Sequence, residues 1–426
     1  MYPRLKGRLH LYLLGLRFRW SYAVGLIGLL YSGITLMLDT PLGGALGLVI
    51  AVLFLLLGVV TVARDVFAVR KDTSDLYEVE LSSEQLRALR LTDTYVSSGY
   101  QQVDLGELRA FYSPEVNRLL WAATPGLKTL ERGFRLMRGA HALQPLLLRT
   151  FFGSGAVIFN QDKVRLVSDP TVESLRRGES VLVQKTDYFA SLCTNEMARR
   201  EVRSRETGAH RYSGLEAMAS NGFLLDLEQS YCSNHVGVGS LAFTSNGQLV
   251  LTVLARGSAQ NPNLLVPSAS GSADWGDLRE GDHLPGFLVR AMERELAEEC
   301  GLEGMRPAPR VETRLLGFAR LLMRGGKPEF FGVSYVDAPF ADLSITRKES
   351  VYIADLLGSR VSRSRAEELT RSIDDFRRRH RHSMSIQLSL HLDFLDDFIR
   401  NCPDGLTHLM NGNSRVSWER RADARG

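Results

Sequence analysis

The sequence predicts an α+β protein in which a mixed β-sheet lies between helices, after a transmembrane helical hairpin and an α/β linking region. Three observations lead to this prediction. Two long uncharged apolar runs stand near the start of the chain, short strand-like segments alternate with turns through its middle, and an acidic segment with helical spacing follows them. With 426 residues, the chain has room for two or three domains.

The composition is that of an ordinary globular protein, with 44% hydrophobic and 23% charged residues. Its net charge of +4 is small and does not indicate binding to nucleic acid. The cysteines are far apart and form no CxxC pair, which argues against a structural zinc site or a disulfide framework. They are Cys193, Cys232, Cys300 and Cys402. A reducing cytosol suits such free thiols.

The two apolar runs predict a membrane hairpin in residues 21–66. Ser21 to Leu38 and Leu42 to Ala63 carry no charge, and each is close to the roughly 20 residues that a helix needs to cross a bilayer. Basic residues fill the N-terminal segment 1–20 and follow the second run, while the turn between the runs has none. The positive-inside rule therefore predicts a multi-pass protein of the inner (cytoplasmic) membrane with both termini cytoplasmic. A cleaved signal peptide and a buried core hairpin are the alternatives.

Residues 67–233 are predicted to form an α/β linking region. The stretch from Leu76 to Leu148 is expected to be mostly helical with breaks, and Ser180 to Phe189 is expected to be a strand. The charged stretch Met197 to Glu206 is expected to be a solvated helix or a linker. The region carries no recognised motif, and we expect it to supply extra strands and substrate contacts to the domain that follows.

Residues 234–405 are predicted to form the sheet-containing domain. Val236 to Phe243 and Gln248 to Ala255 flank a Thr-Ser-Asn-Gly turn, which predicts a β-hairpin. Val311 to Met323 and Phe330 to Val336 are expected to pair across a second glycine-containing turn. After these strands come a charged helix, an apolar helix that packs on the sheet and a loose tail: residues 362–379, 384–399 and 406–426.

An acidic helix is predicted at Arg294 to Leu302. Glu295, Glu298 and Glu299 stand at positions i, i+3 and i+4, so three carboxylates share one helix face. Carboxylates crowded in this way repel one another, and a divalent cation such as Mg²⁺ or Mn²⁺, which prefers oxygen ligands, relieves that repulsion. A solvated acidic turn is the plain alternative. The following Gly301 is expected to end the helix in a left-handed conformation.

The order Arg-Glu-aliphatic-x-Glu-Glu-x-Gly-aliphatic in this segment resembles the second half of the Nudix box, and each defined position is filled. The resemblance implies a Nudix α/β/α sandwich in the C-terminal half, which hydrolyses a diphosphate bond in a nucleoside diphosphate derivative with bound Mg²⁺. It implies that Glu298 and Glu299 bind the metal, that Glu295 is a ligand or the catalytic base, and that Arg294 orients the acids. Many Nudix proteins are dimers, so the resemblance extends to a homodimer.

The first half of the box departs from the family pattern. Counting back from the box arginine puts Gly286 where the pattern has glutamate and Glu280 where it has glycine. A longer loop, Ser270 to Asp277, is expected to carry the glycine turn and to offer Asp274 or Asp277 to the metal. Alternatively, both aspartates only cap the turn.

Four further residues are candidates for the same site. Arg256 follows a predicted strand and is a candidate for contacting a substrate phosphate, unless it is simply an exposed strand-end arginine. Glu329 and Glu349 lie in the later half of the domain, where Nudix domains often add one further carboxylate that binds metal or acts as the base. Glu329 is also a candidate for contacting the substrate, and a surface acid is the alternative for both. His235 is a candidate for facing the cleft or for a buried position in the core.

Two functions are compatible with these features. The first is a membrane-anchored Nudix-type hydrolase, which the filled second half of the box favours. The second is a catalytically weak Nudix-fold sensor that binds a nucleotide and controls the transmembrane hairpin, as in a bacterial antiviral effector; the missing box glutamate favours it. Both have a nucleotide or nucleoside diphosphate derivative and the lipid bilayer as partners.

Overall fold

The computed structural model describes residues 53, 56, 60, 75–105, 108–153, 160–255, 264–346, 349–361 and 366–402. Apart from three residues, the predicted hairpin at 21–66 lies outside the described residues, as do the basic segment 1–20 and the tail at 406–426. Within the described part of the chain, no helix combines the length and the apolar character that a bilayer crossing needs.

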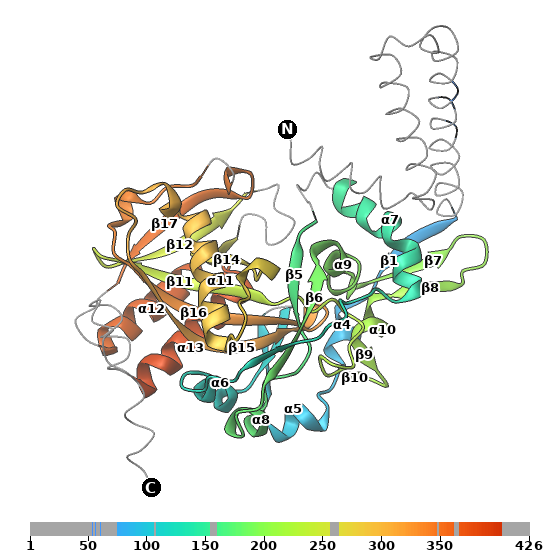
Figure 1. Ribbon diagram of the computed structural model, residues 1–426, viewed down its shortest axis with the longest axis horizontal. Coiled ribbons are helices and arrows are strands. Elements are labelled where there is room, and N and C mark those ends of the chain that lie inside the picture. Colours follow the sequence, from blue (N-terminus) through green and yellow to red (C-terminus); the bar gives the residue numbers. More distant parts are fainter. Residues whose placement is uncertain are drawn as a thin grey trace, which may run out of the picture.

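A mixed sheet of nine strands forms the centre of the molecule (Figure 1). The strands are β2 (Gln101–Leu105), β3 (Leu108–Tyr112), β11 (Gly237–Thr244), β12 (Gln248–Leu254), β13 (Leu265–Pro267), β14 (Ala269–Ser272), β15 (Val311–Leu321), β16 (Lys327–Val336) and β17 (Ile353–Arg360). Their order is β13-β12-β11-β16-β15-β3-β2, with β14 paired to β11 and β17 to β12. Strands β11 and β16 are parallel, whereas β15 and β16 are antiparallel, so the sheet is mixed as predicted.

Helices cover both faces of this sheet. Helix α11 (Leu284–Glu299) packs on one face, and α13 (Ile386–Asn401), joined by α12 (Ala366–His380), packs on the other. Neighbouring residues of β16 show the alternation that a strand requires. The Phe330 ring packs against Phe318 in the core that includes α11, with ring centroids 4.8 Å apart, while the Phe331 ring packs against Phe394 of α13 at 5.0 Å. The predicted α+β class with a mixed sheet is confirmed.

The described part of the linking region forms three small sheets and several short helices. Two sheets have three strands each, in the orders β1-β7-β8 and β4-β6-β5, and the third pairs β9 (Ala219–Ser220) with β10 (Phe223–Leu224). The strands of the first two are β1 (Leu76–Glu80), β4 (Leu127–Thr129), β5 (Asp162–Leu166), β6 (Val181–Asp187), β7 (Arg200–Ser204) and β8 (His210–Ser213). The longest helix of the region is α7 (Arg138–Gly153). In Figure 1, β5 and β6 lie between the nine-stranded sheet and the group formed by α7, β1, β7 and β8.

Two predictions for the linking region are wrong, and one is confirmed. The stretch Leu76 to Leu148 is not mostly helical, because it contains β1, β2, β3 and β4; Met197 to Glu206 contains strand β7. The charged residues of these strands are paired: Arg200 of β7 forms an ion pair with Glu78 of β1 at 3.1 Å, and Glu201 of β7, which is 8% exposed, pairs with Arg203. The expectation of extra strands for the later domain is confirmed, because β3 pairs with β15.

Strand β5 is joined to the later domain through its backbone. The Val164 N–H donates to the Ala273 carbonyl at 3.2 Å, and the Val164 carbonyl accepts from the Val236 N–H at 2.8 Å. Two residues further on, the Leu166 N–H donates to the Asn234 carbonyl at 3.1 Å. These bonds fix β5 against the start of β11 and against the loop that precedes α11.

His391 of α13 gives the fold a sensitivity to acid. It is fully buried, and one ring nitrogen lies 2.9 Å from the Gly332 carbonyl oxygen. Burial lowers the pKa of His391 from 6.5 to about 3, so the folded protein holds a neutral imidazole where the unfolded chain takes up a proton. Protonation therefore favours the unfolded chain as the pH falls from 6.5 toward 3. Over this range the free energy of unfolding decreases by about 1.4 kcal/mol per pH unit.

We expect the His391→Gln variant to lose this part of the acid sensitivity. Its thermal midpoint should be lower than that of the wild type at neutral pH, because packing is lost, but should fall less steeply between pH 6.5 and about pH 4. His382→Gln is the control, since His382 is exposed and should leave the wild-type profile unchanged. Equal slopes for wild type and His391→Gln would contradict a neutral buried imidazole.

Candidate active site

Helix α11 carries the acidic residues and has defined ends. The His283 side chain accepts a hydrogen bond from the Gly286 N–H at 3.0 Å, and Pro285 lies in the first turn, where its missing N–H costs nothing. At the other end, Gly301 has a φ of 72°, which confirms the predicted left-handed conformation after the helix. The acidic residues therefore lie in the last turns, at the negative end of the helix dipole, where carboxylates need neighbouring cations.

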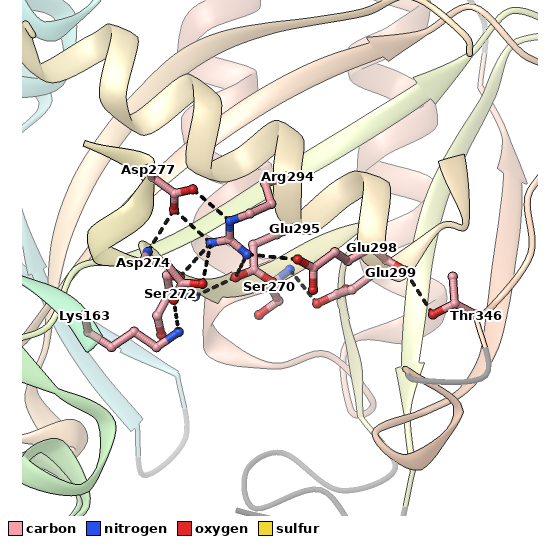
Figure 2. Close-up of polar contacts among 10 residues, drawn as sticks. All are labelled: Lys163, Ser270, Ser272, Asp274, Asp277, Arg294, Glu295, Glu298, Glu299 and Thr346. Atoms are coloured by element: carbon pink, nitrogen blue, oxygen red, sulfur yellow. Dashed lines mark hydrogen bonds and ion pairs between the residues drawn. The ribbon is translucent and has the colours of Figure 1, made fainter. Parts of the chain in front are cut away.

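Arg294 is the residue around which the acids gather (Figure 2). Its guanidinium donates to both carboxylate oxygens of Asp277 at 2.9 Å, and it lies 3.0 Å from Glu295 and 3.5 Å from Glu298. It also donates to the Ser272 carbonyl at 3.1 Å. Burial lowers the pKa of Arg294, but the bond to Asp277 and the charge of Glu295 raise it by more, so the group stays charged. These contacts have the geometry that an orienting role requires.

The backbone of β14 holds two of the glutamates. The Ser272 N–H donates to Oε1 of Glu295, and the Ser270 N–H donates to Oε1 of Glu299, each at 3.3 Å. Gly271 stands between these two donors, and a Cβ atom added there would lie 2.2 Å from the carboxylate carbon of Glu295. The absence of a side chain at this position therefore gives the Glu295 carboxylate its place against the strand.

The loop before α11 uses its aspartates for the turn and for ion pairs. Asp274 and Asp277 form a capping box around the short 3₁₀ helix η2 (Trp275–Asp277), in which the Asp274 N–H donates to Asp277 at 2.8 Å. Asp277 also binds Arg294, and Asp274 forms ion pairs with Lys163 and, at 3.7 Å, with Arg294. These contacts fit the interpretation that the two aspartates shape the loop. Glu280, which stands where the family pattern has glycine, is exposed.

Burial sets the electrostatics of the two inner glutamates. It raises the pKa of Glu295, which the charges of Arg294 and Lys163 lower again in part. Burial raises the pKa of Glu299 well above its usual range, and the neighbouring Glu295 carboxylate raises it further. Oε2 of Glu299 is buried and has no hydrogen-bond partner within the described ranges. A buried carboxylate oxygen without a partner is costly, so a charged Glu299 needs a cation.

The donor set fits a hard divalent cation. Glu295, Glu298 and Glu299 offer only oxygen atoms, and these are the ligands that Mg²⁺ and Mn²⁺ prefer. Among the residues that the structure describes, no three acidic, histidine or cysteine side chains are already grouped as a metal site. Glu298 lies 3.5 Å from Arg294, and its side chain is 22% exposed.

The other predicted residues lie in different surroundings. Glu329 is buried and forms an ion pair with Lys327 at 2.7 Å; it stands across Gly237 from Ser272 in the sheet register. The pKa of Glu299, raised chiefly by burial, is raised further by the charge of Glu349. His235 is a buried histidine, whose pKa is lowered well below 6.5 by burial and by nearby basic groups. Arg256 lies outside the described residues.

Lys163 was not predicted as a site residue. This residue of β5 lies beside the acids, and its ammonium group forms an ion pair with Asp274 (Figure 2). It is buried, with 8% of its side chain exposed. The signal that could have found it is a basic residue, with Arg165 two positions later, inside a strand whose other inner residues are apolar. Such a lysine is rare in a buried position unless it is paired.

Comparisons with known proteins give a limited result. No family model matches the sequence, and no curated protein matches it. Part of the chain is similar to solved structures. These include DR0079 from Deinococcus radiodurans (17% identity, TM-score 0.24, 39% of this chain and 82% of that one) and the MutT protein from Methanosarcina mazei Go1 (14%, 0.26, 39% and 94%). A third is the Nudix hydrolase RenU from M. smegmatis (16%, 0.26, 40% and 88%).

Proposed function

We propose that the chain is a Nudix-type hydrolase that cleaves a diphosphate bond in a nucleoside diphosphate derivative with bound Mg²⁺ or Mn²⁺. The observation that carries the proposal is the group at the end of α11. Glu295 and Glu299 accept hydrogen bonds from β14, Arg294 contacts Glu295 and Glu298, and Oε2 of Glu299 is buried with no partner among the described residues. The sequence resemblance to the second half of the Nudix box supports the same assignment, whereas the structural similarities are too weak to add to it.

Each residue of the group has a role in this hydrolysis. Glu298 and Glu299 would hold the cation, with Glu295 as a further ligand or as the base. The bound cation would offset charge on the phosphoryl oxygens. A water oxygen attacks one phosphorus, the bond from that phosphorus to the bridging oxygen breaks, and Glu295 accepts the proton of the water. Burial raises the pKa of Glu295, which makes it a better proton acceptor, and Arg294 keeps it oriented.

The test is turnover of a substrate panel by the full chain. The panel contains nucleoside diphosphates linked to sugars, to alcohols and to a second nucleotide, each incubated with Mg²⁺ or Mn²⁺, and products are separated by anion-exchange chromatography. We expect at least one member to give two phosphate-bearing products, and a chelator to stop the reaction. Failure to cleave any member, together with failure to bind Mn²⁺, would reject the proposed function.

A sensor without turnover is the second candidate function. The observations that favour it are Gly286 in place of the box glutamate and the ion pairs that Arg294 already makes with Glu295 and Glu298. The same panel separates the two functions. A sensor would bind one member, measured by calorimetry, and release it unchanged after prolonged incubation with Mg²⁺.

We also propose that residues 21–66 form a transmembrane hairpin of the inner membrane. The uncharged apolar runs support it, and so do Leu53, Leu56 and Val60, which are helical and more than half exposed. A reporter fused before Met1 or after Gly426 should remain cytoplasmic, and one inserted at Thr40 should lie outside. Extraction of the full chain from membranes without detergent would overturn this topology. The homodimer stays a prediction.

A further inference from the structure

We propose that Lys163 binds a phosphoryl oxygen of the diphosphate, so that strand β5 of the linking region completes the active site. This inference rests on the proposed function and identifies a substrate-binding residue outside the predicted Nudix domain. It starts from the ion pair of Lys163 with Asp274, which brings a basic side chain of the linking region to the loop before α11.

The backbone fixes where Lys163 lies. Lys163 and Asp274 face each other in an antiparallel bridge, and the next residue, Val164, exchanges hydrogen bonds with Ala273 and Val236. Lys163 is therefore held by the same backbone bonds that position the loop before α11. A lysine held in this way loses little further freedom when its ammonium group meets a ligand.

The charge balance of the site calls for cations. Five carboxylates face two basic side chains among the contacts described above: Asp274, Asp277, Glu295, Glu298 and Glu299 against Arg294 and Lys163. A diphosphate is itself an anion, so its binding here calls for basic side chains besides a divalent cation. Because Arg294 is already engaged by four of the carboxylates, Lys163 is the cation with capacity left for the substrate.

The Lys163 ammonium group has N–H donors left for a ligand. An ammonium group has three N–H donors, and in the described ranges the structure gives Lys163 a single acceptor, Asp274. The side chain is nearly buried, so bulk water does not take the place of the missing acceptors. Phosphoryl oxygens are strong acceptors for such a group, and Lys is a common phosphate ligand in proteins.

The competing explanation is that Lys163 only neutralises Asp274 and pins β5 to the loop. The two explanations differ in what happens when both charges are removed. If neutralisation is the whole role, Lys163→Met combined with Asp274→Asn should restore ligand binding. If Lys163 contacts the phosphate, the double variant should regain stability and still bind the phosphate poorly.

The experiment measures binding of imidodiphosphate, a diphosphate that resists hydrolysis, to the full chain with Mg²⁺ by calorimetry. We expect Lys163→Met to weaken binding about tenfold or more, the loss typical of a charged hydrogen bond, and Lys163→Arg to keep most of it. Lys185→Met is the matched control. Lys185 lies opposite Val164 on β6, is 45% exposed and pairs with Asp162 at 2.8 Å, so its removal should leave binding unchanged.

The outcomes separate this inference from the proposed function. The inference alone would be overturned if Lys163→Met bound imidodiphosphate as tightly as the wild type. It would also be overturned if the double variant recovered binding, or if Lys163→Arg lost as much binding as Lys163→Met. A wild-type chain that neither binds imidodiphosphate nor cleaves the substrate panel would overturn the proposed function together with the inference. In a turnover assay, the supporting result is a raised KM with a smaller change in kcat.

Discussion

Replacing Glu299 with glutamine is expected to lower metal-dependent turnover by about a hundredfold or more without unfolding the protein. The amide keeps the shape of the side chain and the acceptor for the Ser270 N–H, but it cannot supply the charge that a divalent cation needs. Since burial penalises the charged form of Glu299, its neutral replacement should not lower the thermal midpoint. Glu298→Gln should lose turnover in the same way.

Both variants should be assayed over a range of Mg²⁺ concentrations, with binding of Mn²⁺ followed separately by its paramagnetic signal. Glu303→Gln is the control, because Glu303 is an exposed acid one turn beyond the helix end. Wild-type rates in Glu298→Gln or Glu299→Gln at limiting Mg²⁺ would remove that residue from the metal site.

Gly271→Ala is expected to abolish most of the activity while the fold remains intact. Its Cβ would lie 2.2 Å from the carboxylate carbon and 2.3 Å from both carboxylate oxygens of Glu295. The end of a flexible side chain can move away at little cost, so we expect Glu295 to leave the Ser272 N–H rather than the strand to unfold. A displaced base or ligand should lower kcat by about a hundredfold.

Gly276→Ala provides the matched control in the same loop. A Cβ at Gly276 would meet nothing within 4 Å, so this variant should have wild-type activity and stability. The decisive comparison is kcat beside the thermal midpoint. A Gly271→Ala protein with wild-type kcat would show that the position of Glu295 against β14 does not matter for turnover. A strongly lowered thermal midpoint would show that the added methyl group displaces the strand and not the Glu295 side chain.

The acidic helix could be predicted from the sequence because its signals are local. The spacing of its glutamates, the proline of its first turn and Gly301 after its end all lie within a short stretch, and each acts on its own neighbours. Strands β15 and β16 were predictable for a similar reason, since a short turn with two glycines joins two apolar runs.

The remaining parts depend on contacts between distant segments. Lys163 meets Asp274 across 111 positions of the chain, and only the pairing of β5 with the loop before α11 brings them together. Strand β7 was mistaken for a helix or linker because its charged residues suggested solvent on all sides. Instead, Arg200 forms a cross-strand ion pair with Glu78 of β1, which stands 122 positions earlier in the chain. The residues next to β7 in the sequence do not indicate a pairing partner so far away in the chain.

The pairing of β3 with β15 also has a consequence for synthesis of the protein. Phe111 of β3 lies opposite Arg320 of β15, about 200 positions later, so the hairpin of β2 and β3 leaves the ribosome long before its partner strand exists. At a typical elongation rate of about 5–20 residues per second, the edge of β3 waits roughly 10 to 40 seconds. During that interval an unpaired strand edge is open to other chains, and the nascent protein is most exposed to aggregation and most dependent on chaperones.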